Sequence, residues 1–302
     1  VGDMMAFIQY MSTVLLSFMM LLVIILNIPR VVVSFKRINE ILSVEPSISN
    51  TGRIKLNSLE SIEFKNVFFR YDKAHEDILK NISFRIEKGE NVGIIGSSGS
   101  GKTTIVNLLL RHIDATSGEI LINGIDIKEY DIESLRNIFA YTPQKTLLFK
   151  GSIRENLTFD KNLANNVLDN ALDEAAIKDF IDNNSEGYEF KIEQAAANLS
   201  GGQKQRMSIA RALLSGGECL LFDDSFSAVD YITDKRIRSS INKNYSDKMV
   251  ILVTQRVGTI KEADKIIVID EGKIESIGNY ETLENSSKVF KEFIDSQKRE
   301  VA

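Results

Sequence analysis

The stretch that decides the fold is Gly96-Ser97-Ser98-Gly99-Ser100-Gly101-Lys102-Thr103, which follows the pattern G-x-x-x-x-G-K-[S/T]. A β-rich apolar run, Asn91–Ile95, precedes it, and a helical run, Thr103–Arg111, follows it. A strand, a glycine-rich loop and a helix in this order turn several backbone N–H groups toward one point. The sequence therefore predicts a phosphate-binding loop, and this context argues against a chance match by a Gly/Ser-rich turn.

Each residue type in this loop has a chemical reason. Its three glycines let the backbone wrap closely around phosphates, Lys102 places a point charge on the outer phosphates, and the Thr103 hydroxyl reaches Mg²⁺. The residues expected to bind nucleotide here are Gly96, Ser97, Ser98, Gly99, Ser100, Gly101, Lys102, Thr103 and Thr104.

A second motif lies far downstream, where the apolar strand Leu220–Asp223 ends in two carboxylates, Asp223 and Asp224. A strand end beside a phosphate loop is where an acidic residue can hold Mg²⁺. Taken alone, the motif is equally consistent with a strand that ends in a polar turn.

The third motif is Leu199-Ser200-Gly201-Gly202-Gln203, which continues as Lys-Gln-Arg-Met-Ser-Ile-Ala-Arg-Ala-Leu up to Leu213. The whole run resembles the signature sequence of ABC ATPases. Glycines and a serine at a helix start form a second anion-binding N-terminus. The resemblance assigns that role to Ser200, Gly201, Gly202 and Gln203.

The resemblance extends to further positions. It implies that Tyr71 stacks on adenine, although a core tyrosine in a strand is the alternative. It implies that Gln144 bridges Mg²⁺ and a membrane domain, so that the metal ligands are Thr103, Gln144 and Asp223. The loop Ser227–Asp230 resembles the segment that crosses the dimer interface in this family, and Gly151–Leu157 is exporter-like.

The family implies an α/β fold of the P-loop NTPase type. We expect a RecA-like core sheet, an antiparallel β-subdomain and an inserted α-helical signature subdomain at about 145–213, all within a nucleotide-binding domain at 59–302. In this family two such domains sandwich two ATP molecules with Mg²⁺. Each ATP lies between the phosphate loop of one domain and the signature of the other.

The pattern of the domain agrees with that fold, because strands that alternate with helices predict a mostly parallel sheet. The predicted strands are Ile62–Phe68, Ile82–Ile86, Asn91–Ile95, Ile120–Ile122, Ile138–Thr142, Leu220–Asp223, Val250–Thr254, Lys265–Ile269 and Lys273–Ser276. The predicted helices are Thr103–Arg111, Ile132–Arg136, Ala164–Ile181, Gln203–Leu214, Tyr231–Asn242 and Ser287–Gln297.

The N-terminal segment has a different character, since no charged residue lies between Asp3 and Arg30. This run exceeds the ~20 residues that a membrane-spanning helix needs, and it lacks the basic region and small-residue cleavage site of a signal peptide. A buried helix of a soluble protein is the alternative. Basic residues after the run, such as Lys36, mark the cytoplasmic side.

We therefore predict a transmembrane helix, continuing to about Ser43, within 1–45, then a linker at 46–58 and a cytoplasmic nucleotide-binding domain. One helix cannot form a translocation path, and exporter halves of this type have six. The chain is thus expected to be a fragment of a multi-pass protein of the cell membrane. The expected partners are membrane lipid, the remaining transmembrane helices and a transported substrate whose class (drug, lipid or peptide) stays open.

Composition excludes other classes. The 302 residues suggest roughly two domains, and a net charge of −5 argues against a nucleic-acid partner. The single cysteine, Cys219, permits no intrachain disulfide, and it opens an apolar run where a buried structural thiol is expected.

Two positions depart from the family pattern. Asp224 stands where hydrolysing members usually carry the catalytic Glu, and Gln255 stands where they carry a switch histidine. Asp is one methylene shorter than Glu, and a misplacement of ~1 Å can cost on the order of 100-fold in rate. Gln cannot carry the charge of an imidazolium, and neither His75 nor His112 occupies that place in the sequence.

The catalytic candidates are thus Asp224, Gln255 and Gln144. We expect the hydrolysis-impaired subunit of a heterodimeric exporter, whose intact signature completes the site of a second ABC half-transporter. The alternatives are a homodimeric exporter with a slow Asp base and a non-catalytic, nucleotide-gated regulatory module. A soluble ABC ATPase of DNA repair or translation would lack the apolar segment at 4–28. Before the signature, the family usually has a polar stretch that contains an Arg-Gly pair. Here Ala195–Ala197 stands in its place, which leaves coupling to a membrane domain open.

Overall fold

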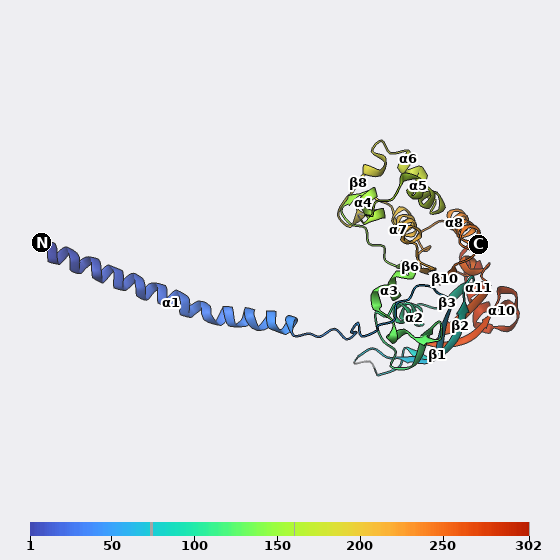
Figure 1. Ribbon diagram of the computed structural model, residues 1–302, viewed down its shortest axis with the longest axis horizontal. Helices are drawn as coiled ribbons and strands as arrows, with labels where there is room; N and C mark the ends of the chain where they lie inside the picture. The colour runs from blue at the N-terminus through green and yellow to red at the C-terminus, as the bar shows by residue number, and fades with distance from the viewer. Residues whose placement is uncertain (73–74, 160, 302) are drawn as a thin grey trace. The chain divides into compact units, whose positions relative to one another are not determined.

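The chain divides into two units, Val1–Ser49 and the region from Asn50 to the C-terminus. A computed structural model describes residues 1–72, 75–159 and 161–301 (Figure 1). Each unit is described by itself below.

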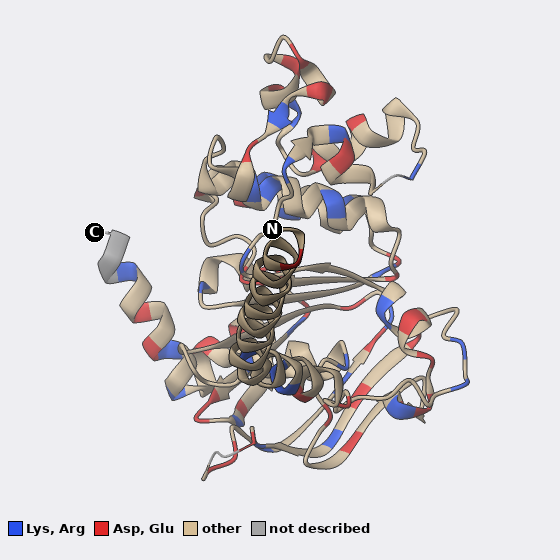
Figure 2. Cartoon of the chain, turned by 90° about the vertical axis from the view of Figure 1, so that its left-hand side faces the viewer, with Lys and Arg blue, Asp and Glu red and all other residues tan. Residues whose placement is uncertain are grey.

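The first unit is a single helix, α1 (Gly2–Leu42), of 41 residues. Its length and composition suffice to cross a membrane, and none of its residues is buried. Between Asp3 and Arg30 the helix carries no charged residue, and Figure 2 shows this long stretch in tan. The predicted continuation of this helix to about Ser43 is confirmed, since Ser43 caps its C-terminus.

Polar side chains within α1 are satisfied by the helix itself. Ser12, Thr13, Ser17 and Asn27 each donate a hydrogen bond of 2.8–2.9 Å to the carbonyl four residues earlier. In hydrocarbon an unsatisfied polar group is costly, so these bonds suit a helix that is surrounded by lipid or apolar neighbours.

The second unit is built on a six-stranded sheet in the order β12-β11-β3-β10-β9-β6. All neighbouring pairs are parallel except β11 with β12. The strands are β3 (Asn91–Gly96), β6 (Phe139–Thr142), β9 (Cys219–Asp223), β10 (Met249–Thr254), β11 (Lys265–Asp270) and β12 (Lys273–Gly278). The predicted mostly parallel sheet is confirmed.

The central strands of this sheet are buried on both faces, which explains their continuous apolar runs. In β9, Leu220 and Phe222 belong to one hydrophobic cluster, whereas Cys219 and Leu221 belong to the other. Cys219 is fully buried, and burial raises the pKa of its thiol, as expected of a structural cysteine.

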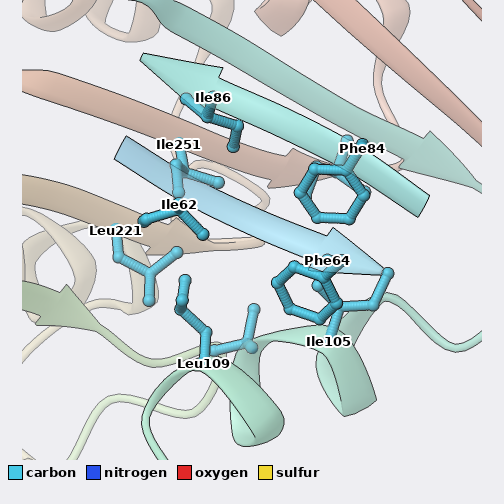
Figure 3. A pocket seen from close by; sticks show the side chains of 10 residues that line it. Ile62, Phe64, Phe84, Ile86, Ile105, Leu109, Leu221 and Ile251 are labelled. Atoms are coloured by element: carbon cyan, nitrogen blue, oxygen red, sulfur yellow. The ribbon is translucent and has the colours of Figure 1, made fainter. Parts of the chain in front are cut away.

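A second, antiparallel sheet in the order β2-β1-β4-β5 packs over the helix that follows the phosphate loop. Its strands are β1 (Ser61–Phe69), β2 (Leu79–Glu87), β4 (Ser117–Ile122) and β5 (Ile125–Asp126), and the helix is α2 (Lys102–Leu109). Figure 3 shows Phe64 and Phe84, stacked at 4.5 Å, beside Leu109 and Leu221. Only a gap of about 10 Å³ remains between these apolar side chains, so this is a packed core and not a ligand site.

A helical region with one short hairpin contains the signature. Its elements are β7 (Gly151–Ser152), α4 (Ile153–Thr158), α5 (Asn165–Glu174), α6 (Lys178–Asp182), β8 (Lys191–Ile192) and α7 (Gly201–Ser215). The predicted single helix Ala164–Ile181 is wrong. The chain breaks after α5 because Ala176 is left-handed (φ 53°), and Arg206 donates a 2.6 Å hydrogen bond to its carbonyl.

The other helices are α3 (Ile132–Asn137), α8 (Tyr231–Asn244), α9 (Val257–Ile260), α10 (Tyr280–Ser286) and α11 (Lys288–Val301), with three short 3₁₀ turns at Ile127–Glu129, Gly187–Glu189 and Gln194–Ala196. The predicted helices at 103–111, 132–136, 203–214 and 231–242 are confirmed. The short elements α4, α9, α10, β5, β7 and β8 were not predicted, because their periodicity is too short to detect.

The segment between the two units lies partly against the folded unit. Arg53 and Ile54 donate backbone hydrogen bonds to the Glu129 carbonyl, and Leu56 is buried. Gly52 sits so close to Tyr130 that an added Cβ would lie 2.0 Å from its carbonyl oxygen. Residues from Asn50 onward therefore belong with the second unit.

We expect Leu221→Ala to lower the free energy of unfolding by about 2–5 kcal/mol, because it enlarges a gap in a core that cannot collapse around it. Urea denaturation followed by circular dichroism measures this. The control Val167→Ala alters a side chain that is 45% exposed, and should cost less than about 0.5 kcal/mol. Equal, small effects of both changes would contradict the core described here.

Candidate nucleotide-binding site

The candidate site lies at the carboxyl ends of four adjacent parallel strands. Ligands of open α/β sheets bind at this edge. The phosphate loop (Gly96–Thr103) follows β3, Gln255 follows β10, Asp223 ends β9 and Gln144 follows β6. The order β3-β10-β9-β6 brings these four points together although they are up to 159 positions apart in sequence.

The edge encloses an open cavity of about 290 Å³. Its lining residues are Ile78, Ser98, Gly99, Gly101, Lys102, Thr103, Thr104, Gln144, Asp223, Asp224 and Gln255. The structure thus brings most of the predicted nucleotide, metal and catalytic residues around one space.

The glycines of the phosphate loop are required by its backbone. Gly99 and Gly101 have φ angles of +80° and +104°, which side chains rarely adopt. Gly96 is needed for a different reason, since a Cβ there would lie 2.3 Å from the carbonyl oxygen of Ile269 on the neighbouring strand.

Lys102 is held inside the loop. Its ammonium donates hydrogen bonds of 2.7 Å to the carbonyl oxygens of Gly96 and Ser97, and the residue is 8% exposed. Burial lowers the pKa of Lys102, and the charges of Asp224 and Asp223 oppose that effect. A phosphate in the loop would give this desolvated charge an anionic partner, which two carbonyl dipoles only approximate.

Asp223 carries the feature that best fits a metal ion. Its Oδ1 accepts a hydrogen bond of 3.4 Å from the Thr103 hydroxyl, while its buried Oδ2 has no hydrogen-bond partner among the described residues. Burial raises the pKa of Asp223 to about 6. A hydroxyl and a carboxylate at one edge are ligands that Mg²⁺ accepts, with water completing its octahedron.

Asp224 follows in a left-handed conformation, with φ 47°. Its backbone N–H donates to the Val253 carbonyl at 2.7 Å, and its Oδ2 accepts from the Gln144 amide at 3.4 Å. Burial raises the pKa of Asp224, and the Gln144 hydrogen bond and Lys102 counteract it. This hydrogen bond joins two of the predicted catalytic residues, Gln144 and Asp224.

Gln255 also lines the cavity, but its exposed side chain sits on a turn that is held by other residues. Residues 255–257 form this turn, called the 255–257 turn. Gln297 on α11 contacts its backbone, and Arg256 donates to carbonyl oxygens of the loop after Asp224. Sequence reasoning missed both residues, because an Arg and a Gln in polar surroundings carry no pattern that predicts such contacts.

The signature segment (Leu199–Gln203) begins α7 but does not line the phosphate-loop cavity. Ser200 is the N-cap, and its side chain and that of Gln203 form a reciprocal capping box with bonds of 3.2 and 2.8 Å. Gln205 joins α7 to the loop Ser227–Asp230, predicted above to cross a dimer interface, by accepting from the Ala228 N–H and donating to the Ser227 hydroxyl. Within one chain the two anion-binding elements are therefore separate.

Other predicted positions lie outside the cavity. Tyr71 is 41% exposed and rests edge-on against Phe69 at 4.7 Å, so it is not a core tyrosine. His75 is exposed, and burial lowers the pKa of His112, whose ring lies near Asn107. Ala195 and Ala196 both have positive φ angles (56° and 52°) at a place where the family pattern has a glycine.

A glycine-rich loop between a buried strand and a helix, opposite an acidic strand end, defines a P-loop nucleotide-binding domain. Residues 79–227 match the ABC transporter family model. The chain therefore carries the ATP-binding domain of the ABC transporter family, which makes this unit an ABC-type ATPase domain.

Similar proteins agree. The chain is 34% identical over 304 residues to an ABC transporter ATP-binding protein of Mycobacterium tuberculosis, covering 98% of this chain and 52% of that protein. It is 37% identical over 261 residues to the ATP-dependent lipid A-core flippase of Haemophilus influenzae, covering 85% and 44%. A bacterial Atm1-family ABC exporter solved with ATP bound superimposes with a TM-score of 0.83 at 32% identity, covering 90% of this chain and 48% of that one. The chain spans about half the length of these relatives.

We expect Asp223→Asn to stabilise the protein in the absence of Mg²⁺ and nucleotide. The buried carboxylate has a pKa of about 6 when folded and about 4 when unfolded. Above pH 6 the folded state therefore holds an unfavourable buried charge, and below about pH 4 this cost disappears. Asp223→Asn should increase the free energy of unfolding by on the order of 1–3 kcal/mol at neutral pH. It should also remove the gain in stability that the unmodified protein shows as the pH falls from 6 to 4.

Thermal denaturation across this pH range measures the effect, with Asp247→Asn, at an exposed carboxylate, as the control. The same experiment with Mg²⁺ and ATP should show stabilisation of the unmodified protein and little of Asp223→Asn. A lower melting temperature of Asp223→Asn without ligand would contradict the account of the buried charge.

Proposed function

We propose that this chain is part of one half of an ABC exporter dimer, in which ATP binding and hydrolysis drive a substrate across the cell membrane. One observation carries the dimer: the signature segment begins α7 and contributes no residue to the phosphate-loop cavity of its own chain. Each is a site for an anion that is only half surrounded, and a second half-transporter would supply the missing half. The similarity to exporters, including a lipid A-core flippase, supports this.

The helix α1 is proposed to be the last transmembrane helix of a multi-pass protein. It is long and apolar enough to span a bilayer, and basic residues (Arg30, Lys36, Arg37) follow its apolar run on the side of the nucleotide-binding unit. That unit would then lie in the cytoplasm. The remaining transmembrane helices would lie outside the part of a half-transporter that this chain represents, and they would select the transported substrate.

Nucleotide would be bound through its phosphates by the loop N–H groups and Lys102, and Tyr71 would stack on the base. Thr103, Asp223 and Gln144 would hold Mg²⁺, which would neutralise negative charge that develops on the phosphates. The orphaned Oδ2 of Asp223 supports this assignment. Asp224 is the only described carboxylate of the cavity besides Asp223, and would orient the attacking water.

This site is proposed to be impaired in hydrolysis. The backbone N–H of Asp224 donates to the Val253 carbonyl, which fixes the position of its backbone. Because Asp is one methylene shorter than Glu, its carboxylate ends short of the place that a Glu carboxylate would reach. A general base must lie within ~2.6–3.2 Å of its proton. Gln255 cannot supply positive charge to the transition state. The intact signature segment would instead complete the competent site of a different half-transporter, which makes a heterodimer the favoured assembly.

The test is the steady-state ATPase activity of the 302-residue chain in detergent, at increasing protein concentration, beside the double change Asp224→Glu with Gln255→His. We expect the double change to raise turnover on the order of 100-fold, because it restores the reach of the base and the switch charge. Adding Lys102→Ala to the double change should return activity to background, which would show that the gained turnover arises in this site.

Brisk turnover by the unmodified chain would replace the impaired-site proposal with a homodimer that uses Asp224 as its base. A silent double variant that still binds ATP with Mg²⁺ would favour a non-catalytic regulatory module.

A further inference from the structure

The C-terminal helix α11 carries one polar side chain on its buried face. Phe290, Ile294 and Gln297 follow the i, i+4, i+7 spacing of a single helix face. Phe290 is 0% and Ile294 is 5% exposed, and both belong to the hydrophobic cluster that includes β9 and β10. These anchors direct the next residue of that face, Gln297, toward the end of β10.

Both ends of the Gln297 amide are used there. Its Nε2 donates to the Gln255 carbonyl at 2.7 Å, and its Oε1 accepts from the Val257 N–H at 2.9 Å. Val257 is the first residue of α9, whose first N–H groups have no partner within the helix. The N-cap residue, Arg256, provides no side-chain cap, so Gln297 satisfies this N–H from 40 residues away.

The 255–257 turn points in two directions. Gln255 lines the phosphate-loop cavity. The Arg256 guanidinium donates to the carbonyl oxygens of Phe226, Ser227 and Val229 at 3.3, 2.6 and 3.3 Å. These carbonyls belong to the loop that begins after the acidic strand end, so one turn connects the nucleotide cavity to the predicted interface loop.

Contact between α11 and the site is local. A second cavity, of about 980 Å³, lies between the phosphate-loop residues Gly96 and Ser97 and the helix, and both Gln255 and Gln297 line it. Apolar side chains of α9 and α11 also meet in one hydrophobic cluster. Among the described residues, the two hydrogen bonds of Gln297 are the polar contacts that join α11 to the 255–257 turn.

The geometry points to Gln297 as a positioning residue. Its side-chain amide holds the 255–257 turn to the C-terminal helix, and thereby fixes Gln255 at the phosphate-loop cavity and Arg256 on the loop Ser227–Asp230. Its consequence for turnover rests on the proposed function, whereas the positioning itself does not. Removing the amide should loosen the turn while α11 stays anchored by Phe290 and Ile294.

The test uses site-directed spin labelling of the full chain, which is simplified because the only native thiol, Cys219, is buried. A nitroxide on Gln255→Cys reports the turn, and one on Glu292→Cys, at an exposed position of α11, reports the helix. We expect Gln297→Met, which keeps the side-chain length, to make the label at position 255 more mobile, seen as narrower lines in its electron paramagnetic resonance spectrum. The spectrum of the label at position 292 should stay unchanged. Gln297→Glu keeps the acceptor for the Val257 N–H, so the label mobility at position 255 should lie between that of the unmodified protein and that of Gln297→Met. Lys298→Met serves as the matched control.

Unchanged mobility at position 255 in Gln297→Met would overturn the inference. Equal loosening at both labels would also overturn it, because Gln297 would then only support the helix. As a second readout, Gln297→Met in the Asp224→Glu, Gln255→His protein should lower kcat on the order of 10-fold with little change in the KM for ATP, since Gln297 does not line the phosphate-loop cavity. If that protein shows no turnover, the proposed function fails while the spectra still decide on Gln297.

Discussion

The carboxylate of Asp223 is buried at the end of β9 with one oxygen that no described residue satisfies, and the site is arranged around that demand. The parallel register of β9 with β10 and β6 places it at the sheet edge, and burial on both faces of the sheet keeps water from screening it. Thr103 satisfies the other oxygen. Lys102 brings a positive charge that is itself desolvated. Such an arrangement is costly when empty and favourable when a cation and an anion arrive together.

The two anion-binding elements of the chain are organised in opposite ways. The phosphate loop follows a strand of the parallel sheet, and Gly99 and Gly101 give it positive φ angles that other residues rarely adopt. The signature segment starts a helix of the separate helical region, and it is capped by its own Ser200 and Gln203. Gln205 then ties that helix to Ala228 of the interface loop. The Arg256 guanidinium donates to the Ser227 carbonyl of the same loop, so α7 and the 255–257 turn both contact this loop.

Local patterns were sufficient for much of this structure. The phosphate loop and the acidic end of β9 were predicted from spacing and apolar runs, whereas Gln144 and Gln255 were assigned from the resemblance to ABC ATPases. The structure places them around one cavity with Asp223. The break at Ala176 could not be predicted, since it depends on an Arg206 side chain 30 residues away and alanine itself favours helix. Gln297 could not be predicted either, because its partners are backbone atoms of a distant turn, and hydrogen bonds to the main chain leave no trace in residue type.

The self-satisfied side chains of α1 have a mechanical consequence. Ser12, Thr13, Ser17 and Asn27 spend their donors on the carbonyls of their own helix. These donors therefore demand no particular polar partner from a neighbouring helix. Contacts along this surface are then governed by shape, and rotating or sliding the helix against its neighbours breaks none of these four bonds. This surface therefore places no polar constraint on the apolar side chains or lipid that pack against α1, and the polar residues of the helix do not fix its rotation.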